Sequence, residues 1–230
     1  MRNTNKCLLL YSGGLDSTTL LYWLVKEKGY NVNAVTLLYG QKHMKEVIFA
    51  KKNIEKVKNA THHILDISEI SKFLKNGSTL IMGGKEVPKL EQISSEDKIQ
   101  PPTYVPNRNM IFLSIAIGIA ESMEIGEVYY SAQAQDEYGY WDCTEEFVKR
   151  INQVVELNRK NTIKIYAPFL NLSKSEIIKL GMNLGVDYSL TWSCYRGDEK
   201  PCGVCPTCVE RLKAFSKLGL QDPLEYETLS

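Results

Sequence analysis

No segment of this sequence is suited to crossing a membrane, because no apolar run approaches the ~18 residues that a transmembrane helix requires. The first residues, MRNTNKCLLLY, lead straight into a strand pattern, without the longer apolar stretch and small-residue cleavage site of a secretory signal. Internal repeats and low-complexity tracts are also missing. We therefore expect a cytoplasmic globular protein.

An excess of either charge is missing as well, since 28 lysines and arginines stand against 27 aspartates and glutamates. This balance provides no broad basic face for nucleic acid or for a membrane surface. A tRNA-modifying or zinc-knuckle RNA-binding protein is the alternative of another class, but 230 residues leave little room for an added RNA-binding domain. We expect neither a membrane partner nor a stable nucleic-acid partner.

Strand and helix patterns alternate along the chain, which is long enough for one substantial core with a small appendage. The predicted strands are 6–11, 32–39, 62–67 and 127–132, and the predicted helices are 17–28, 42–58, 107–124 (largely buried), 144–160 and 173–184. The last helix begins with a capping box, Ser173 with Glu176. The alternation predicts an α/β fold with a Rossmann-like parallel sheet and helices on both faces. We place the main domain at 1–190 and a small C-terminal element at 191–230.

The range 68–105 breaks this rhythm, with several glycines and prolines and no sustained periodicity. A long irregular insertion in a compact domain is typical either of a lid over a functional site or of a mobile loop. We also consider it for a subunit interface, since we expect a homodimer.

A glycine turn follows the first predicted strand and opens the first helix. It comprises Ser12, Gly13, Gly14, Leu15, Asp16, Ser17 and Thr18. Converging backbone N–H groups and the positive end of a helix hold anions, so the turn predicts a phosphate site, with a plain structural turn as the alternative. Asp16 suits a phosphate site only if Mg²⁺ bridges the two. The lysine of the Walker loop is absent, and the dinucleotide-binding pattern G-x-G-x-x-G does not match.

Four of the six cysteines crowd together near the C-terminus, as Cys194, Cys202, Cys205 and Cys208. In an intracellular chain this spacing favours a metal over disulfides. Four thiolates complete a tetrahedral Zn²⁺ shell with no open position, so we expect one structural zinc per chain. An iron–sulfur cluster remains the main alternative, and a redox-active C-x2-C pair is a weaker one. Cys7, in the first predicted strand, is expected to be a buried apolar residue.

These two motifs belong to an ordered series of landmarks. The series is SGGLDSTT at 12–19, YGQKH at 39–43, YVPNRN at 104–109, DEYGYWDC at 136–143 and TWSCYRGDEKPCGVCPTC at 191–208. The first resembles the SGGxDS signature of the PP-loop ATP pyrophosphatases, and the whole series resembles the QueC family of 7-cyano-7-deazaguanine synthases. The resemblance implies that ATP is cleaved between its α and β phosphates, that AMP passes to a substrate oxygen, and that pyrophosphate stays on the loop.

The implied reaction converts 7-carboxy-7-deazaguanine into the nitrile with ammonia and ATP–Mg²⁺. Adenylation gives the carboxylate a good leaving group, and ammonia then forms an amide. A second adenylation, on the amide oxygen, permits elimination to the nitrile. Much of the catalysis is then positioning and charge neutralisation.

Site residues follow from the same resemblance. The backbone of 12–18 should hold the β and γ phosphates, with Asp16 serving Mg²⁺. Lys174 suits pyrophosphate or the charge that develops at the α-phosphate, and Arg108 suits ATP or the substrate carboxylate. For Lys174 and Arg108 a solvated surface position is the alternative.

A second group follows the predicted strand 127–132, where the carboxyl ends of parallel strands line a ligand crevice. Asp136, Tyr140 and Asp142 are candidate substrate residues, since a carboxylate there can read a guanine-like edge. Tyr138, Tyr140 or Trp141 can stack on the ring, with aromatic packing of the loop as the alternative.

This region departs from the family pattern GVxxxDxSGYPDCRxEF, because the chain reads SAQAQDEYGYWDCTEEF. Ser131 and Ala132 replace Gly-Val, Trp141 replaces a proline and Thr144 replaces an arginine. The departures motivate a second hypothesis, a QueC-like paralogue that delivers the activated acid to another amine, such as a protein N-terminus in antiphage defence. A nucleophilic role for Cys143 is a minor idea, because none of His43, His62 and His63 is a convincing base for it.

Overall fold

A five-stranded, entirely parallel sheet forms the centre of the molecule, with strand order β3-β2-β1-β4-β5. The computed structural model describes residues 5–92, 101–133, 140–159, 162–196 and 199–228. The strands are β1 (Lys6–Leu10), β2 (Asn31–Leu38), β3 (Ala60–Asp66), β4 (Glu127–Tyr129) and β5 (Lys164–Tyr166). The expected Rossmann-like sheet is confirmed. The strand that sequence patterns missed is β5, at the edge of the sheet.

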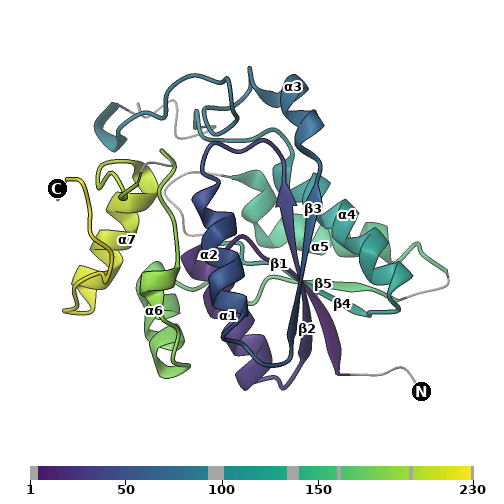
Figure 1. The fold of residues 1–230 in the computed structure, drawn as a ribbon. Coiled ribbons are helices and arrows are strands. Elements are labelled where there is room, and N and C mark those ends of the chain that lie inside the picture. The colour runs from purple at the N-terminus through teal and green to yellow at the C-terminus, as the bar shows by residue number, and fades with distance from the viewer. Residues whose placement is uncertain (1–4, 93–100, 134–139, 160–161, 197–198, 229–230) are drawn as a thin grey trace.

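Helices cover both faces of this sheet (Figure 1). On one side lie α1 (Leu15–Lys26), α2 (Lys45–Ile54), α6 (Lys174–Asn183) and α7 (Pro206–Lys217), and on the other lie α4 (Arg108–Ser122) and α5 (Glu145–Val155). Within the described ranges, no helix combines the length and apolar character needed to span a membrane.

The two cores follow from the alternation of side chains along the central strand. In β1, Cys7 and Leu9 enter the core beneath α1 and α6, whereas Leu8 enters the core beneath α4 and α5. All three side chains are fully buried, as expected for a parallel strand that is covered on both faces. Cys7 is therefore a buried apolar residue, as predicted.

Helix α4 begins and ends within two residues of its predicted bounds, but the prediction that it is largely buried is wrong. Only Leu113, Ala116 and Ala120 are buried, while Met110 and other residues of the helix remain exposed. The helix contacts the sheet with one stripe of small and apolar side chains, and apolar residues on its remaining surface carry the hydrophobic composition.

The described part of the 68–105 range contains only short elements, namely α3 (Ser71–Leu74) and the 3-10 turns Ser68–Ile70 and Leu90–Gln92. Leu80 and Ile81 are nevertheless completely buried, and they pack with Tyr39 and Val105 in a small core of their own. A backbone bridge also joins Ile81 to Gln41 beyond the end of β2. Segments of this range are thus anchored above the carboxyl end of the sheet, and its role as a lid stays a prediction.

The order of the strands fixes where a ligand can enter. Strands β1 and β4 are neighbours, yet the helices that follow them lie on opposite faces of the sheet (Figure 1). The loops after these strands therefore diverge, and parallel sheets bind ligands in the crevice that such a divergence opens.

Candidate active site and metal centre

A cavity of about 260 Å³ lies at this divergence, at the carboxyl end of the sheet. Its lining includes residues from the first turns of five helices: Asp16 of α1, Glu46 of α2, Arg108 of α4, Lys174 of α6 and Thr207 of α7. Each helix N-terminus carries a partial positive charge and unpaired N–H groups. The cavity is accordingly suited to an anion with several phosphate groups.

The glycine loop forms one wall of the cavity. The first helical hydrogen bond runs from Thr18 N to Gly14 O at 3.0 Å, so the amides of Leu15, Asp16 and Ser17 precede it. Ser12 fixes the turn, because its Oγ accepts from Gly14 N at 3.1 Å and lies 3.0 Å from Ser17 Oγ. Apart from Gly13 and Thr18, the predicted phosphate-loop residues line the cavity.

Gly13 and Thr18 shape the loop from behind. Gly13 has a φ of +88°, and a Cβ at this position would lie 2.3 Å from the backbone oxygen of Glu46. Only glycine permits both this backbone conformation and the close approach of α2. Thr18 is completely buried, with its Oγ1 3.5 Å from the hydroxyl of Tyr11.

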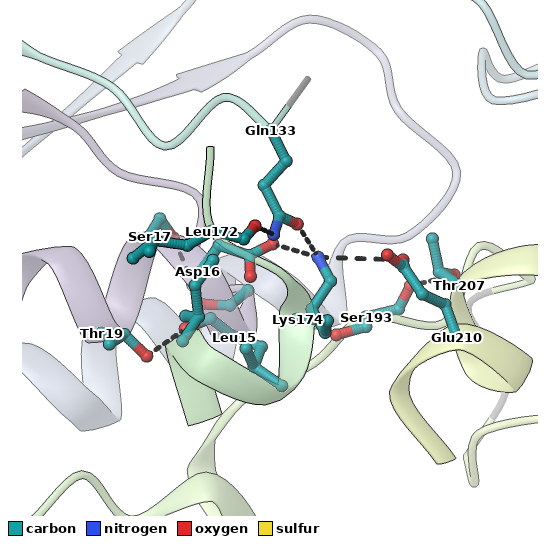
Figure 2. Close-up of polar contacts among 12 residues, drawn as sticks. Leu15, Asp16, Ser17, Thr19, Gln133, Leu172, Lys174, Ser193, Thr207 and Glu210 are labelled. Carbon is teal, nitrogen blue, oxygen red and sulfur yellow. Dashed lines mark hydrogen bonds and ion pairs between the residues drawn. The ribbon is translucent and has the colours of Figure 1, made fainter. Parts of the chain in front are cut away.

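Lys174 reaches across the cavity to the glycine loop (Figure 2). Its Nζ lies 2.7 Å from Asp16 Oδ2 and 3.8 Å from Glu210 Oε2, and it donates a hydrogen bond to Gln133 Oε1. The side chain is only 13% exposed, so it is not a solvated surface charge. The predicted capping box is confirmed, and it starts α6 at Lys174. Gln133, which sequence reasoning missed, is itself held by Leu172 O at 2.9 Å.

The two carboxylate oxygens of Asp16 have different surroundings. Oδ2 is paired with Lys174, while Oδ1 is buried and has no hydrogen-bond partner in the part of the chain that the structure describes. Mg²⁺ prefers carboxylate oxygens as ligands, and this one is buried, unpaired and beside a phosphate-binding turn. The residues present therefore fit the ion.

Arg108 and a set of titratable groups form the opposite wall. The half-buried guanidinium of Arg108 faces Tyr39, and its charge influences both His43 and Glu46. Burial raises the pKa of Glu46 to about 8, although the Arg108 charge lowers it. Burial and Arg108 together lower the pKa of His43 to about 4. Sequence reasoning missed Glu46 as a site residue. The signal that could have found it is its position shortly after the YGQKH landmark at 39–43.

In the described part of the 136–143 landmark, some residues line the cavity and others support the start of α4. Asp136 and Tyr138 lie outside the described residues. Tyr140 lines the cavity, and its hydroxyl lies 2.8 Å from Thr103 Oγ1. Asp142 is buried and accepts a hydrogen bond from Asn109 N at 3.1 Å, at the start of α4, and burial raises its pKa. A carboxylate at a helix N-terminus stabilises that end of the helix. Asp142 therefore fixes the start of α4, and with it Arg108, which precedes Asn109 in the chain.

Two of the departures from the family pattern, Trp141 and Thr144, make contacts with neighbouring scaffold residues. Trp141 donates from Nε1 to the hydroxyl of Tyr104 at 2.8 Å, and its ring meets Phe147 edge to face. Thr144 is the N-cap of α5, where its Oγ1 accepts from Phe147 N at 3.2 Å. Neither residue is among the described residues that line the cavity, whereas Ser131 and Ala132, the third departure, do line it.

The four clustered cysteines form a candidate metal centre next to the cavity. The sulfur atoms of Cys194, Cys202, Cys205 and Cys208 all lie within 4.8 Å of one another and are buried. Backbone amides support them, since Cys202 N donates to Cys194 Sγ at 3.4 Å and Cys205 N donates to Cys202 Sγ at 3.3 Å. Such amide–sulfur contacts orient thiolates and spread their charge.

The spacing of these sulfurs fits a single ion. A tetrahedral site with Zn–S bonds of about 2.3 Å holds its sulfurs ~3.8 Å apart. An iron–sulfur cluster places several irons and sulfides between the ligands, which requires a wider cage. The metal centre also supports the site, because Ser193 and Tyr195 flank Cys194 and line the cavity. Trp192 N donates to Gly13 O at 3.3 Å.

Comparisons with known proteins agree with the landmarks. A family model described as Queuosine biosynthesis protein QueC matches residues 6–219. The 7-cyano-7-deazaguanine synthase of Caldicellulosiruptor saccharolyticus is 45% identical over 96% of each chain. The protein of the same name from Archaeoglobus fulgidus is 45% identical over 95% of this chain and 89% of its own.

Two solved structures share the fold at low identity. The U34-tRNA thiolase NcsA from Methanococcus maripaludis, with its [4Fe-4S] cluster, matches with a TM-score of 0.51 and 15% identity, over 98% of this chain and 75% of its own. The NMN synthetase from Francisella tularensis matches with a TM-score of 0.51 and 16% identity, over 95% and 79%. The fold is thus shared with a tRNA thiolase and an NMN synthetase. The family model and the curated relatives are more specific, and they show that the chain belongs to the QueC family.

Proposed function

We propose that the protein is an ATP-dependent carbon–nitrogen ligase that converts 7-carboxy-7-deazaguanine and ammonia into 7-cyano-7-deazaguanine. The observation that carries the proposal is the contact of Lys174 with Asp16 at the glycine loop, inside a cavity that five helix N-termini surround. The relatives that bear the name of this activity, 45% identical to the chain over nearly its whole length, support the choice of substrate.

ATP binds with its β and γ phosphates on the amides of the glycine loop. Asp16 Oδ1 would hold Mg²⁺, which would supply positive charge to the phosphate oxygens. Lys174 stands on the cavity wall, where its ammonium stabilises the negative charge that develops as pyrophosphate leaves. Gln133 Oε1 accepts a hydrogen bond from Lys174 and so keeps that side chain in the cavity.

The acid binds on the opposite wall. Arg108 offers a guanidinium to its carboxylate, and the ring of Tyr140 is available to stack on the heterocycle. Asp142 orients Arg108 through the start of α4. A role for Asp136 in reading the guanine-like edge stays a prediction.

The acceptor amine is the part of the proposal for which two outcomes compete. Trp141 and Thr144 were the reason to consider a protein amine, but each makes a local structural contact away from the cavity lining. The departure at Ser131 and Ala132 does line the cavity. We propose ammonia as the acceptor because the relatives named as 7-cyano-7-deazaguanine synthases are 45% identical to this chain. Conjugation to another amine, as in an antiphage system, is the alternative.

A product assay tests the proposal. The protein is incubated with 7-carboxy-7-deazaguanine, ATP, Mg²⁺ and ammonium, and the products are identified by mass spectrometry. We expect the nitrile together with AMP and pyrophosphate, and no product with Asp16→Asn. Accumulation of the adenylate or the amide without nitrile would contradict the proposal and favour the paralogue.

Two further expectations accompany this proposal, one about the oligomeric state and one about the location in the cell. A homodimer and a cytoplasmic location stay predictions. Light scattering of the purified protein measures the first, and cell fractionation measures the second.

A further inference from the structure

The proposed reaction makes a demand that phosphate binding does not meet. The nitrogen enters as ammonia with three hydrogens and leaves as a nitrile with none. One proton must leave when ammonia attacks the acyl adenylate, and two more must leave as the amide is adenylated and eliminated. Groups that accept a proton from nitrogen are therefore needed in the cavity, and a positioned base contributes about 10²–10⁴-fold to such a step.

Three carboxylates line the cavity within the part of the chain that the structure describes, namely Asp16, Glu46 and Glu210. Asp16 and Glu210 both face the ammonium of Lys174, at 2.7 and 3.8 Å. Each of these two carboxylates is thus engaged in an ion pair with the lysine. Glu46 is the carboxylate of the three that does not face this lysine.

Glu46 occupies the gap between the glycine loop and His43. Its Oε1 lies 3.6 Å from the point where a Cβ on Gly14 would stand, and its Oε2 lies 3.5 Å from His43 Nε2. The Glu46 side chain is 17% exposed, and that of His43 is 3% exposed. The carboxylate is thus directed to the loop on which the reacting phosphate is expected, in a place where little water competes.

We propose that Glu46 is a catalytic residue, the base that takes the proton from the nitrogen as it bonds to the acyl carbon. In this step the nitrogen lone pair forms the C–N bond, the bond from carbon to the AMP oxygen breaks, and AMP leaves with that electron pair. The proton from nitrogen passes to a Glu46 oxygen. His43 is a positioning residue, because its neutral imidazole holds the carboxylate without pairing it with a charge. This inference rests on the proposed function.

The charges around Glu46 are consistent with such a role. Burial raises its pKa, as does Asp16 on α1, while Arg108 on α4 lowers it, and the balance is a value of about 8. A base is most effective when its pKa lies near the working pH, since it is then both available and strong enough. His43, with its pKa lowered to about 4, is too weak a base to replace it.

The test separates adenylation from amine capture. Exchange of labelled pyrophosphate into ATP, dependent on the acid, reports adenylation alone. Glu46→Gln keeps the size and hydrogen-bonding shape of the side chain but accepts no proton. We expect this variant to keep the exchange rate within about threefold of the wild type and to lose amide formation from ammonia by about 100-fold or more.

Hydroxylamine supplies the readout that a structural defect would not restore. It is a weakly basic, strongly nucleophilic amine that loses its proton readily, so it needs less help from a base. Glu46→Gln should therefore form the hydroxamate at close to the wild-type rate. Glu46→Asp should recover part of the reaction with ammonia. Glu55→Gln, at the exposed C-terminal end of α2, is the matched control and should change neither reaction.

Each outcome decides between accounts. Loss of exchange in Glu46→Gln, or equal loss of amide and hydroxamate, assigns Glu46 to ATP binding or folding and overturns the inference. Unchanged amide formation overturns it as well. Absence of acid-dependent exchange in the wild type is a different failure, because it removes the proposed function itself.

Discussion

The ammonium of Lys174 lies 2.7 Å from Asp16 Oδ2, although 158 positions separate the two residues in the chain. The contact joins the first turn of α6 to the first turn of α1, two helices on the same face of the sheet (Figures 1 and 2). It places a cation beside the glycine loop. The chemistry we propose depends on this arrangement.

Replacing Lys174 should therefore impair adenylation much more than folding. For Lys174→Ala we expect acid-dependent pyrophosphate exchange to fall about 10²–10³-fold, because a preorganised charge at the developing anion is lost. Lys179→Ala, on the exposed side of the same helix, should retain the wild-type rate. Equal activity of the two variants would show that Lys174 serves only structure.

Gly13 should be intolerant of any side chain. Gly13→Ala adds a methyl group 2.3 Å from Glu46 O and 2.7 Å from Ala50 N, at a φ of +88°. We expect a loss of several kcal/mol in the free energy of unfolding, measured by urea denaturation. Gly29→Ala is the matched control, since φ is +69° there but the space is open, and it should cost only about 1 kcal/mol. Similar losses at the two positions would contradict the packing of the loop against α2.

Metal analysis should find one zinc ion per chain and no iron. The spacing of the four sulfurs fits a mononuclear centre, and structural zinc sites contribute directly to folding. Cys208→Ser should lower both the zinc content and the melting temperature. Iron with acid-labile sulfide, together with a brown colour after anaerobic purification, would refute the zinc assignment.

The ionisation of Glu46 should change the free energy of unfolding as well as the reaction rate. Its folded pKa of about 8 lies above its ordinary value of 4.5, so its contribution to stability is complete below pH 4.5 and disappears as the pH rises through 8. His43 behaves oppositely, because its pKa falls from 6.5 to about 4, and its contribution is complete above pH 6.5.

Between pH 6.5 and 8, the stability contribution of Glu46 therefore changes while that of His43 stays constant. Between these values we expect the ligand-free wild type to lose about 1–2 kcal/mol of unfolding free energy relative to Glu46→Gln. Chemical denaturation at the two pH values measures this difference. Parallel pH dependence in both proteins would mean that the Glu46 carboxyl is already ionised throughout.

Much of the fold was readable in the sequence because its signals are local. The strand runs, the glycine turn and the capping box at Ser173 each depend on residues a few positions apart, and each is confirmed. The short strand β5, at the edge of the sheet, escaped detection. The burial of α4 was misjudged because composition cannot tell which stripe of an apolar helix meets the sheet.

Residues of the site could be predicted only where they stand together in a sequence motif. The cysteine cluster and the glycine loop contain their spacing in the sequence. Gln133 and Glu46 enter the cavity through the sheet order and through the packing of α2 on Gly13, which are tertiary facts. Trp141 and Thr144 suggested a changed pocket in the sequence, but their contacts lie in the scaffold of α4 and α5.

The most direct test of the whole account follows the nitrogen and the nucleotide together. The wild-type protein is supplied with ¹⁵N-ammonium, 7-carboxy-7-deazaguanine, Mg²⁺ and excess ATP, and the labelled products and AMP are quantified over time. The account predicts 7-cyano-7-deazaguanine with ¹⁵N in the nitrile and two AMP formed for each nitrile, one for each adenylation. An unlabelled or absent nitrile, with the acid transferred instead to another amine, would contradict it.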